Sequence, residues 1–236
     1  GGQDELVFDG DSFAMDKKGK IIARLPSWKE FNQTLKIINY GSEIKIISSM
    51  ICKKLKIEES MWRAIVTGLR DYVYKNSFSN IILGLSGGID SAVSAAVAVD
   101  ALGPNNVIGV RMPSKYSSEG SLIDASETSK LLGIKIYTIP ISNVLDAYLS
   151  DMKPSLQQKN YQITEENLQS RIRGTLLMAF SNNLNSILLT TGNKSEMSVG
   201  YSTIYGDMNG GFSVLKDIYK SDVYKLARWR NNSKKL

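Results

Sequence analysis

The segment that most constrains the fold is 83–92, which runs LGLSGGIDSA. The apolar run Ile81-Ile82-Leu83 precedes it, and the small residues 92–97 follow it. A strand, a turn of glycines and hydroxyls and then a helix is an arrangement that binds phosphate, because backbone amides and the helix dipole both favour an anion there. The segment has no lysine and does not fit the pattern G-x-x-x-x-G-K-S/T, so at this point it is open which phosphate it holds.

From residue 81 onward, strand and helix patterns alternate. Strands are predicted over 81–85, 107–111, 134–139 and 186–190, and helices over 91–102, 119–132 and 165–182. Apolar strands separated by helices predict an α/β fold, with a parallel sheet covered by helices on both faces. Ligands of such sheets bind beyond the carboxyl ends of the strands. The loops 86–91, 112–118 and 191–196 all fall there, which predicts a single site.

The first 25 residues have a different pattern, typical of short β-strands. Strand candidates lie at 5–8, 12–15 and 21–25. A β meander this small buries too little surface to be stable alone, so it must pack on something else. Residues 26–42 are predicted to be an irregular polar connection. A helix is predicted after it, because Met61, Ile65, Leu69, Tyr72 and Val73 recur at helical spacing.

Composition limits the chemistry and the partners. The chain has no histidine and a single cysteine, Cys52, which excludes Ser-His and Cys-His mechanisms built from its own residues. We interpret Cys52 as a small packed hydrophobe, and one cysteine favours a reducing, cytoplasmic setting. The net charge of +6 is scattered, and the run 53–56 is interpreted as a solvated helix face, so no nucleic-acid partner is expected. No apolar run approaches the roughly 20 residues of a membrane span, so no membrane partner is expected.

The residue types of the loop suit a magnesium–pyrophosphate site. Gly84, Gly87 and Gly88 allow the backbone to approach an anion closely, and Ser86 adds a hydroxyl donor. Asp90 needs an explanation, because a carboxylate repels phosphate unless a cation lies between them. A Mg²⁺ ion bridging Asp90 and phosphate oxygens provides that cation. The alternative interpretation is that Asp90 is only the N-cap of the following helix.

These residues carry a resemblance to a known superfamily. The run Ser86-Gly87-Gly88-Ile89-Asp90-Ser91 matches the SGGxDS signature of the ATP pyrophosphatases, which cleave ATP between the α and β phosphates. The segments 111–134, 166–182 and 188–231 resemble the core of glutamine-dependent NAD⁺ synthetases, and 1–28 resembles the end of their nitrilase-like glutaminase domain. The resemblance implies a fold of the adenine nucleotide alpha hydrolase type. It also implies a fragment, with a glutaminase remnant and linker over 1–40 and a C-terminally truncated synthetase domain over 41–236.

The implied reaction is the ATP-dependent amidation of deamido-NAD⁺ to NAD⁺ through an acyl adenylate, with release of AMP and pyrophosphate. ATP and Mg²⁺ are the implied cofactors. Ammonia comes from glutamine in the full-length family, and free ammonium is expected to serve this chain. A homo-oligomer is also expected. Because adenylation makes an unreactive carboxylate open to attack by ammonia, the protein has mainly to position its substrates and stabilise charge.

The resemblance further implies roles for individual residues. Contacts to ATP are implied for Gly84, Leu85, Ser86, Gly87, Gly88, Ile89, Asp90, Ser91, Arg111, Thr191 and Lys220. Contacts to deamido-NAD⁺ are implied for Asn167, Glu196, Tyr201, Ser202, Thr203 and Ile204. Asp90 and Lys220 are the implied catalytic residues, and Asp90 and Glu196 the implied metal ligands.

Each of the charged residues also has a simpler interpretation. Arg111 is then the donor of a surface salt bridge, Glu196 an ordinary acid in the first turn of a helix, and Lys220 a solvent-facing lysine. Arg171 and Arg173 are two apart on a predicted helix, so only one of them is expected to reach the site. The glycine-punctuated stretch 200–211 is predicted to be a mobile lid.

Two other functions stay open at this stage. One is a different SGGxDS enzyme, such as a GMP synthetase or a tRNA-modifying enzyme, which would carry a basic RNA-binding extension or a different helix pair after the sheet. The other is a catalytically inactive remnant that retains nucleotide binding.

Overall fold

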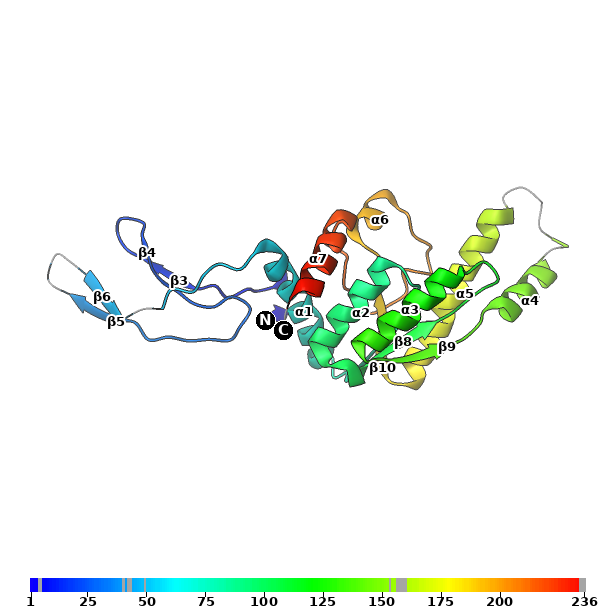
Figure 1. Cartoon of the computed structure of the whole chain (residues 1–236), viewed down its shortest axis with the longest axis horizontal. Coiled ribbons are helices and arrows are strands. Elements are labelled where there is room, and N and C mark those ends of the chain that lie inside the picture. Colours follow the sequence, from blue (N-terminus) through cyan, green and yellow to red (C-terminus); the bar gives the residue numbers. More distant parts are fainter. Residues whose placement is uncertain are drawn as a thin grey trace.

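A parallel sheet lies at the centre of the computed structural model, which describes residues 1–3, 6–39, 41, 44–48, 50–152, 154–155 and 161–233. Its strands run in the order β11-β10-β7-β8-β9, each parallel to its neighbours (Figure 1). The bounds are β7 (Asn80–Gly84), β8 (Val107–Arg111), β9 (Lys135–Thr138), β10 (Ser186–Thr190) and β11 (Phe212–Ser213). In register, Leu83 pairs with Gly109 of β8 and Leu189 of β10, which aligns the carboxyl ends of the three strands.

Helices cover both faces of this sheet, which confirms the predicted α/β class. One face carries α1 (Ile57–Lys75), α2 (Ile89–Leu102), α3 (Glu119–Leu132) and α7 (Lys220–Asn232), and the other carries α4 (Ser142–Met152) and α5 (Tyr161–Asn183). Alternate residues of β7 enter opposite cores. Leu83 belongs to the cluster of Trp62 from α1, whereas Ile82 belongs to the cluster of Leu145 from α4. A strand that is buried on both faces needs consecutive apolar residues, which explains the unbroken apolar run at 81–83.

The predicted elements around the sheet are confirmed with small shifts. β8, β10 and α3 have the predicted bounds, and Gly133 ends α3 in the left-handed conformation, with φ 68°. α2 begins at Ile89 rather than at 91, and α5 begins at 161 rather than at 165. The sequence patterns did not indicate α4, the 3-10 turn η1 (Pro104–Asn106), β11 or α7, and only the interpretation of Glu196 as a first-turn acid indicated α6 (Lys194–Val199). A six-residue helix and a two-residue strand are too short to show a period.

Before α1 the described residues form three short antiparallel pairs. β1 (Gly2–Gln3) pairs with β2 (Leu6–Val7), β3 (Phe13–Met15) with β4 (Ile21–Arg24), and β5 (Lys36–Asn39) with β6 (Ile44–Ser48). The two hairpins β3–β4 and β5–β6 project away from the α/β unit (Figure 1). The strand candidates are therefore confirmed in position, except that Glu5 lies outside the described residues. The prediction of one meander was wrong, because β2 and β3 belong to separate pairs.

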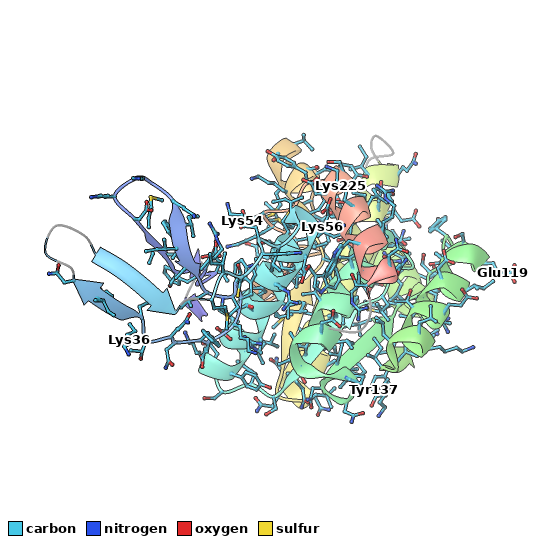
Figure 2. All side chains as sticks on the ribbon, turned by 60° about the vertical axis from the view of Figure 1, so that its left-hand side comes forward. Lys36, Lys54, Lys56, Glu119, Tyr137 and Lys225 are labelled. Carbon is cyan, nitrogen blue, oxygen red and sulfur yellow. The ribbon has the colours of Figure 1, made fainter. Side chains whose placement is uncertain are left out.

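Two further predictions for this region were wrong. Residues 26–42 are not wholly irregular, because β5 lies within them. The run 53–56 is not helical, and Figure 2 shows Lys54 and Lys56 on the segment before α1. The reason is pairing at long range: the amide of half-buried Cys52 donates to the carbonyl of Arg24 at 2.9 Å, which keeps the chain extended there. The division into domains stays a prediction.

Strands β1 and β2 pack on α1, so this part of the N-terminal region has the support that it was expected to need. The amide of Gly2 donates to Oδ2 of Asp71 at 2.6 Å, and Nζ of Lys75 donates to the Gly2 carbonyl. Trp28 donates from Nε1 to the hydroxyl of Ser60 at 2.9 Å. These contacts attach the start of the chain to the helix that also borders the central core.

A charged cluster holds α7 against α1 and α2. Asp100 on α2 accepts hydrogen bonds from Nε1 of Trp62 at 2.8 Å and from Nε and Nη2 of Arg230, each at 2.7 Å. The ring of Trp62 also packs against Trp229, with centroids 5.9 Å apart. This cluster therefore anchors the C-terminal end of α7, the helix that begins at Lys220.

Replacing Arg230 with methionine should lower the free energy of unfolding by about 3 kcal/mol, because it leaves a charged carboxylate without its cation. The side chain of Asp100 is only 9% exposed, so water does not compensate. Arg63→Met is the control. Arg63 pairs with Glu59 at 2.9 Å, and both side chains are more exposed than that of Asp100, so the loss of this pair should lower the free energy of unfolding by less than about 1 kcal/mol. Urea unfolding of both variants measures the difference, and equal losses would contradict this role for Asp100.

Candidate functional site

The order of the strands places a site between β7 and β10. The strands that follow β7 in the sequence, β8 and β9, lie on one side of it, and the later strands β10 and β11 lie on the other side. The strand order therefore reverses between β7 and β10. Ligands of open α/β sheets bind at such a point, beyond the carboxyl ends of the strands. Two clefts of about 640 Å³ and 610 Å³ meet there. Both are lined by Ser86, Thr190, Thr191, Tyr201, Ser202 and Asp207.

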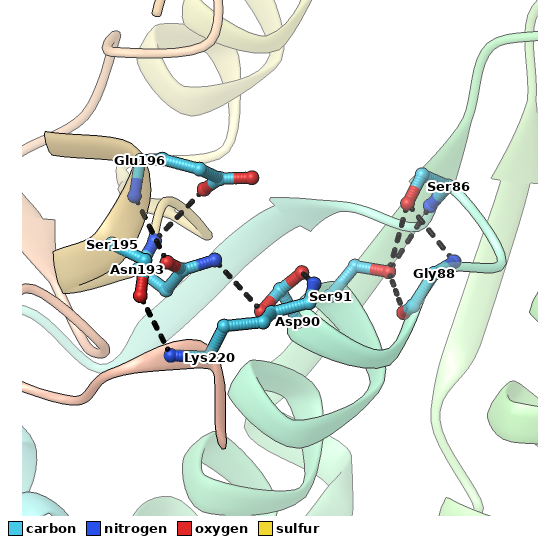
Figure 3. A network of polar contacts seen from close by, with 8 residues as sticks. All are labelled: Ser86, Gly88, Asp90, Ser91, Asn193, Ser195, Glu196 and Lys220. Atoms are coloured by element: carbon cyan, nitrogen blue, oxygen red, sulfur yellow. Dashed lines mark hydrogen bonds and ion pairs between the residues drawn. The ribbon is translucent and has the colours of Figure 1, made fainter. Parts of the chain in front are cut away.

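The loop between β7 and α2 is shaped by its own hydroxyl groups (Figure 3). Oγ of Ser86 accepts from the amide of Gly88 at 3.1 Å, and Oγ of Ser91 donates to the Gly88 carbonyl at 2.9 Å. The two hydroxyls lie 3.1 Å apart. Gly88 is the N-cap of α2, so the loop leads directly to the positive end of a helix dipole. The loop is therefore preorganised for an anion.

Gly87 is the tightest position of this loop. Its φ is +83°, and a Cβ atom there would lie 2.2 Å from the carbonyl oxygen of Ser121 at the start of α3. Glycine is thus required both by the backbone conformation and by the close approach of α3.

Asp90 lies in the first turn of α2 and is held by two other elements. Its Oδ1 accepts from Nδ2 of Asn193 at 3.2 Å, and its Oδ2 forms an ion pair with Nζ of Lys220 (Figure 3). The interpretation of Asp90 as the N-cap was wrong, because Gly88 has that position and the Asp90 side chain points to Asn193 and Lys220. The interpretation of Lys220 as only a solvent-facing lysine was also wrong, since it pairs with Asp90.

Glu196 belongs to a capping box at the start of α6. Oδ1 of Asn193 accepts from the Glu196 amide at 3.1 Å, and Oε2 of Glu196 accepts from the Asn193 amide at 3.0 Å. The simpler interpretation of Glu196 as a first-turn acid is therefore confirmed, and the residue also lines the second cleft. Sequence reasoning missed Asn193, although the spacing N-x-x-E is a recognised signal of a helix start.

The structure brings most of the predicted site residues to the two clefts. The first cleft is lined by Gly84, Leu85, Ser86, Arg111, Asn167, Thr191, Tyr201, Ser202 and Thr203. The second is lined by Ser86, Asp90, Ser91, Thr191, Glu196, Tyr201 and Ser202. The residues outside both linings are Gly87, Gly88, Ile89, Lys220 and Ile204. Lys220 nevertheless contacts the second cleft through Asp90, whereas Ile204 is exposed.

Arg111 joins three elements at the edge of the first cleft. Its guanidinium donates to the Leu122 carbonyl at 2.8 Å, to the Ser126 hydroxyl at 2.6 Å and to Oγ1 of Thr138 at 3.0 Å. These partners are neutral, so the interpretation of Arg111 as a surface salt bridge was wrong. The contacts orient the arginine, and its positive charge is not cancelled by them.

Of the two arginines on α5, only Arg173 lines the first cleft, as expected. It donates from Nε to the Met112 carbonyl at 3.2 Å, and burial lowers the pKa of its guanidinium. Arg171 is exposed and donates to the carbonyl of Ile204 at 3.2 Å. Arg173 is thus a half-buried arginine of α5 at the wall of the first cleft.

The segment 200–211 covers the clefts and packs closely on α5. Oγ1 of Thr203 donates to Oδ1 of Asn167 at 3.1 Å, and the amide of Asp207 donates to the Ser170 hydroxyl at 3.0 Å. A Cβ atom at Gly174 would lie 2.9 Å from the Gly206 carbonyl. This segment therefore forms a wall of the site here, and its motion as a lid stays a prediction.

Several other residues of the clefts were not predicted from the sequence. They are Tyr72, Ser170, Asp207, Met208, Phe212 and Lys216. Tyr72 packs on Phe212 with ring centroids 4.9 Å apart, which places α1 at the wall of the second cleft. Tyr72 follows the core pattern of α1, so its spacing alone could not mark it as a site residue.

The donor set suits Mg²⁺ held jointly with a phosphate. Among the described residues, no cluster of three or more acidic or cysteine side chains could form a metal site by itself. Asp90 and Glu196 both line the second cleft, beside the phosphate-type loop. Magnesium in proteins is commonly bound by one or two carboxylates, with phosphate and water oxygens as its other ligands. Asp90 and Glu196 fit that requirement.

Fold and site together define an α/β nucleotide-binding protein whose glycine–serine loop lies at the switch point of a parallel sheet. The profile of the family described as NAD synthase matches residues 61–236, and this chain belongs to that family. The glutamine-dependent NAD⁺ synthetase of Synechocystis is 46% identical over 238 residues, which cover 100% of this chain and 42% of that relative. The one from Thermotoga maritima is 45% identical and covers 98% of this chain and 46% of its own length.

Solved structures of related synthetases have a similar fold. A glutamine-dependent NAD⁺ synthetase from Acinetobacter baumannii, in complex with ADP, has a TM-score of 0.92 and 43% identity, covering 98% of this chain and 44% of that one. An NMN synthetase from Francisella tularensis has a TM-score of 0.70 and 29% identity, and the match covers 76% of this chain and 73% of that one. The chain thus spans somewhat less than half the length of the glutamine-dependent relatives it matches. Among the described helices, none is long and apolar enough to cross a membrane.

Proposed function

We propose that this chain provides the synthetase site for ATP-dependent amidation of deamido-NAD⁺, with AMP, pyrophosphate and NAD⁺ as products. The observation that carries this proposal is the preorganised loop 86–91 at the switch point, with Asp90, Asn193 and Lys220 gathered at the start of α2. Such a loop suits the pyrophosphate that leaves when ATP becomes AMP. Family membership supports the same reaction.

The residues have distinct roles in this proposal. The amides and hydroxyls of loop 86–91 bind the departing pyrophosphate, and Asp90 and Glu196 hold Mg²⁺. When bound, Mg²⁺ neutralises phosphate oxygens and so makes pyrophosphate a better leaving group. Lys220 and Lys216 add positive charge beside the second cleft. No covalent intermediate with the protein is needed, which agrees with a chain that has no histidine.

The two substrates share the clefts. The first cleft offers apolar walls at Leu85, Val110 and Leu122, which suit an adenine ring, and the charge of Arg111. Asn167 lines the first cleft and Glu196 the second, so a deamido-NAD⁺ molecule that contacts both must cross the shared wall of Ser86, Thr191, Tyr201 and Ser202. The proposed reaction requires the carboxylate of that molecule to lie near the α-phosphate of ATP.

The decisive experiment incubates the purified chain with ATP, Mg²⁺, ammonium and deamido-NAD⁺ and measures AMP and NAD⁺. Equal amounts of both products are expected, with no product when EDTA is added. A parallel sample replaces deamido-NAD⁺ with the deamidated mononucleotide, because one structural relative is an NMN synthetase. Product only with the mononucleotide would contradict the proposed substrate. ATP binding without any product from folded protein would instead favour the inactive remnant.

Ammonia source and assembly are part of the same proposal. We expect ammonium to support the reaction and glutamine not to, because Cys52 is the only cysteine and lies between the hairpins and α1, apart from both clefts. Residues 1–40 are proposed to be the end of a glutaminase domain, and the chain is proposed to form a homo-oligomer. Comparing initial rates with the two nitrogen donors tests the first point, and sedimentation of the chain tests the last.

Replacing Arg173 with methionine should weaken ATP binding about tenfold, because a half-buried cation is lost from the first cleft. The same change should leave the free energy of unfolding unchanged or raise it, since burial disfavours this charge. Arg171→Met is the matched control and should bind ATP normally, because Arg171 is exposed and lines neither cleft. Calorimetric titration with ATP measures both, and equal losses in the two variants would contradict this assignment.

A further inference from the structure

The Asp90 carboxylate already has a cation in contact with it, and that cation belongs to the chain. Nζ of Lys220 forms an ion pair with Oδ2, and Nδ2 of Asn193 donates to Oδ1 at 3.2 Å, so both oxygens have partners (Figure 3). The side chain of Asp90 is 17% exposed, whereas that of Lys220 is 40% exposed. A metal ion that binds Asp90 has to compete with the ammonium group for the same oxygen.

The backbone of Lys220 is held, but its side chain has room to leave. The Lys220 amide donates to the Ser195 hydroxyl at 3.0 Å, and the amide of Lys194 donates to the Ile218 carbonyl at 2.9 Å, which fixes the start of α7 against α6. The ammonium group is also 5.9 Å from the ring centroid of Tyr224. A flexible four-carbon stem that is partly in water can therefore swing without movement of the helices.

Asp90 keeps favourable contacts when Lys220 leaves. The Asn193 amide still donates to it, and its place in the first turn of α2 puts it in the positive end of the helix dipole. The free carboxylate is thus stable enough to accept another cation. A second cation of higher charge, however, would repel the ammonium group while both contact one oxygen.

We propose that Lys220 is an exchangeable counter-ion, which occupies Asp90 in the nucleotide-free protein and moves to the polyphosphate when a divalent cation takes its place. The inference rests on the proposed function of the site and adds the order in which Lys220 and the divalent cation occupy Asp90. A divalent cation alone binds poorly, because it has to displace Lys220 with nothing to receive the lysine. Bound with a polyphosphate, the same cation enters readily, because the phosphate oxygens accept the displaced ammonium group. Lys220 therefore couples metal binding to nucleotide binding.

The proposal predicts effects of opposite sign from one substitution. Lys220→Met should raise the affinity for Mn²⁺ in the absence of nucleotide by about tenfold, because a like charge is removed from the metal position. The same variant should lower the affinity for ATP in the presence of Mg²⁺ by about tenfold, because a phosphate partner is lost. Electron paramagnetic resonance of free Mn²⁺ measures the first effect, with Mg²⁺ as the competitor, and calorimetry measures the second.

Three variants make the test specific. Lys225→Met has the same change in net charge on the same helix, but Lys225 pairs with Asp222 and should change neither affinity (Figure 2). Lys220→Gln can still donate a hydrogen bond to Asp90, so it provides the same test if the methionine variant fails to fold. Lys220→Met combined with Asp90→Asn should lose the gain in Mn²⁺ affinity.

An unchanged Mn²⁺ affinity in folded Lys220→Met or Lys220→Gln protein overturns the exchange. So does a gain that persists without the Asp90 carboxylate, since the metal then binds elsewhere. The proposed function is judged separately, from product formation by the unsubstituted chain. Opposite shifts in affinity without NAD⁺ formation contradict the function alone, and NAD⁺ formation without the shifts contradicts the exchange alone.

Discussion

Replacing Gly87 with alanine should weaken ATP binding by about 100-fold, equivalent to about 2.8 kcal/mol. The new Cβ would lie 2.2 Å from the Ser121 carbonyl oxygen and 2.8 Å from its Cα atom, so either loop 86–91 or α3 must move. Movement of the loop breaks the geometry in which its amides point to one anion. Neither neighbour is a flexible side chain that could yield. Calorimetric titration with MgATP measures the loss.

The chain provides a matched control for this change at Gly103. That residue has the same φ of +83°, but nothing lies within 4 Å of its Cβ position. Gly103→Ala should therefore lower the free energy of unfolding by about 1 kcal/mol through backbone strain, as at Gly87, and leave ATP binding unchanged. If both variants lost ATP binding equally, strain and not the contact with α3 would be the cause.

Replacing Asp90 with asparagine should lower the rate of pyrophosphate release by about 1000-fold, or about 4 kcal/mol of activation free energy. Asparagine keeps the shape and can still contact Asn193, but it has no charge with which to hold Mg²⁺ beside the loop. The melting temperature should change little, because the lost ion pair with Lys220 is partly exposed to water. A coupled assay of pyrophosphate measures the rate, and a thermal melt checks the fold.

Asp222→Asn is the control for this second prediction. Asp222 is also in the first turn of a helix and also pairs with a lysine, Lys225, at 2.7 Å. It lines neither cleft, so its variant should release pyrophosphate at the normal rate. Full activity of Asp90→Asn, or equal losses in the two variants, would falsify the proposed metal role of Asp90.

The sheet could be predicted because its signals are short in range. The strand at 107–111 and the helix at 119–132 have their predicted bounds, since burial on both faces gives unbroken apolar runs and a glycine ends the helix. The N-terminal region could not be predicted as well. There, the pairing of β5 with β6 and the contact of Cys52 with Arg24 decide the conformation, and no period along the chain records such pairings.

The candidate site was predicted in part for the same reason. The loop 86–91 is contiguous, so its residues carry their own signal of phosphate binding. The spacing N-x-x-E marks Asn193 only as a helix start, and the sequence could not decide which of Arg171 and Arg173 reaches the site until folding placed Arg173 at the first cleft. Their contribution depends on which strands are neighbours and which face of α5 is turned inward.

The α/β class, the phosphate-type loop at 86–91 and the edge of the sheet where loops converge could all be predicted from the amino-acid sequence. These follow from local patterns of apolar residues and glycines, whose conformational preferences act within a few residues. Three contacts became visible only in the folded protein: the pair of Lys220 with Asp90, the approach of α3 to Gly87, and the attachment of α7 to Asp100 through Arg230. These contacts join residues far apart in the chain, and their energies depend on distance and burial in the folded protein.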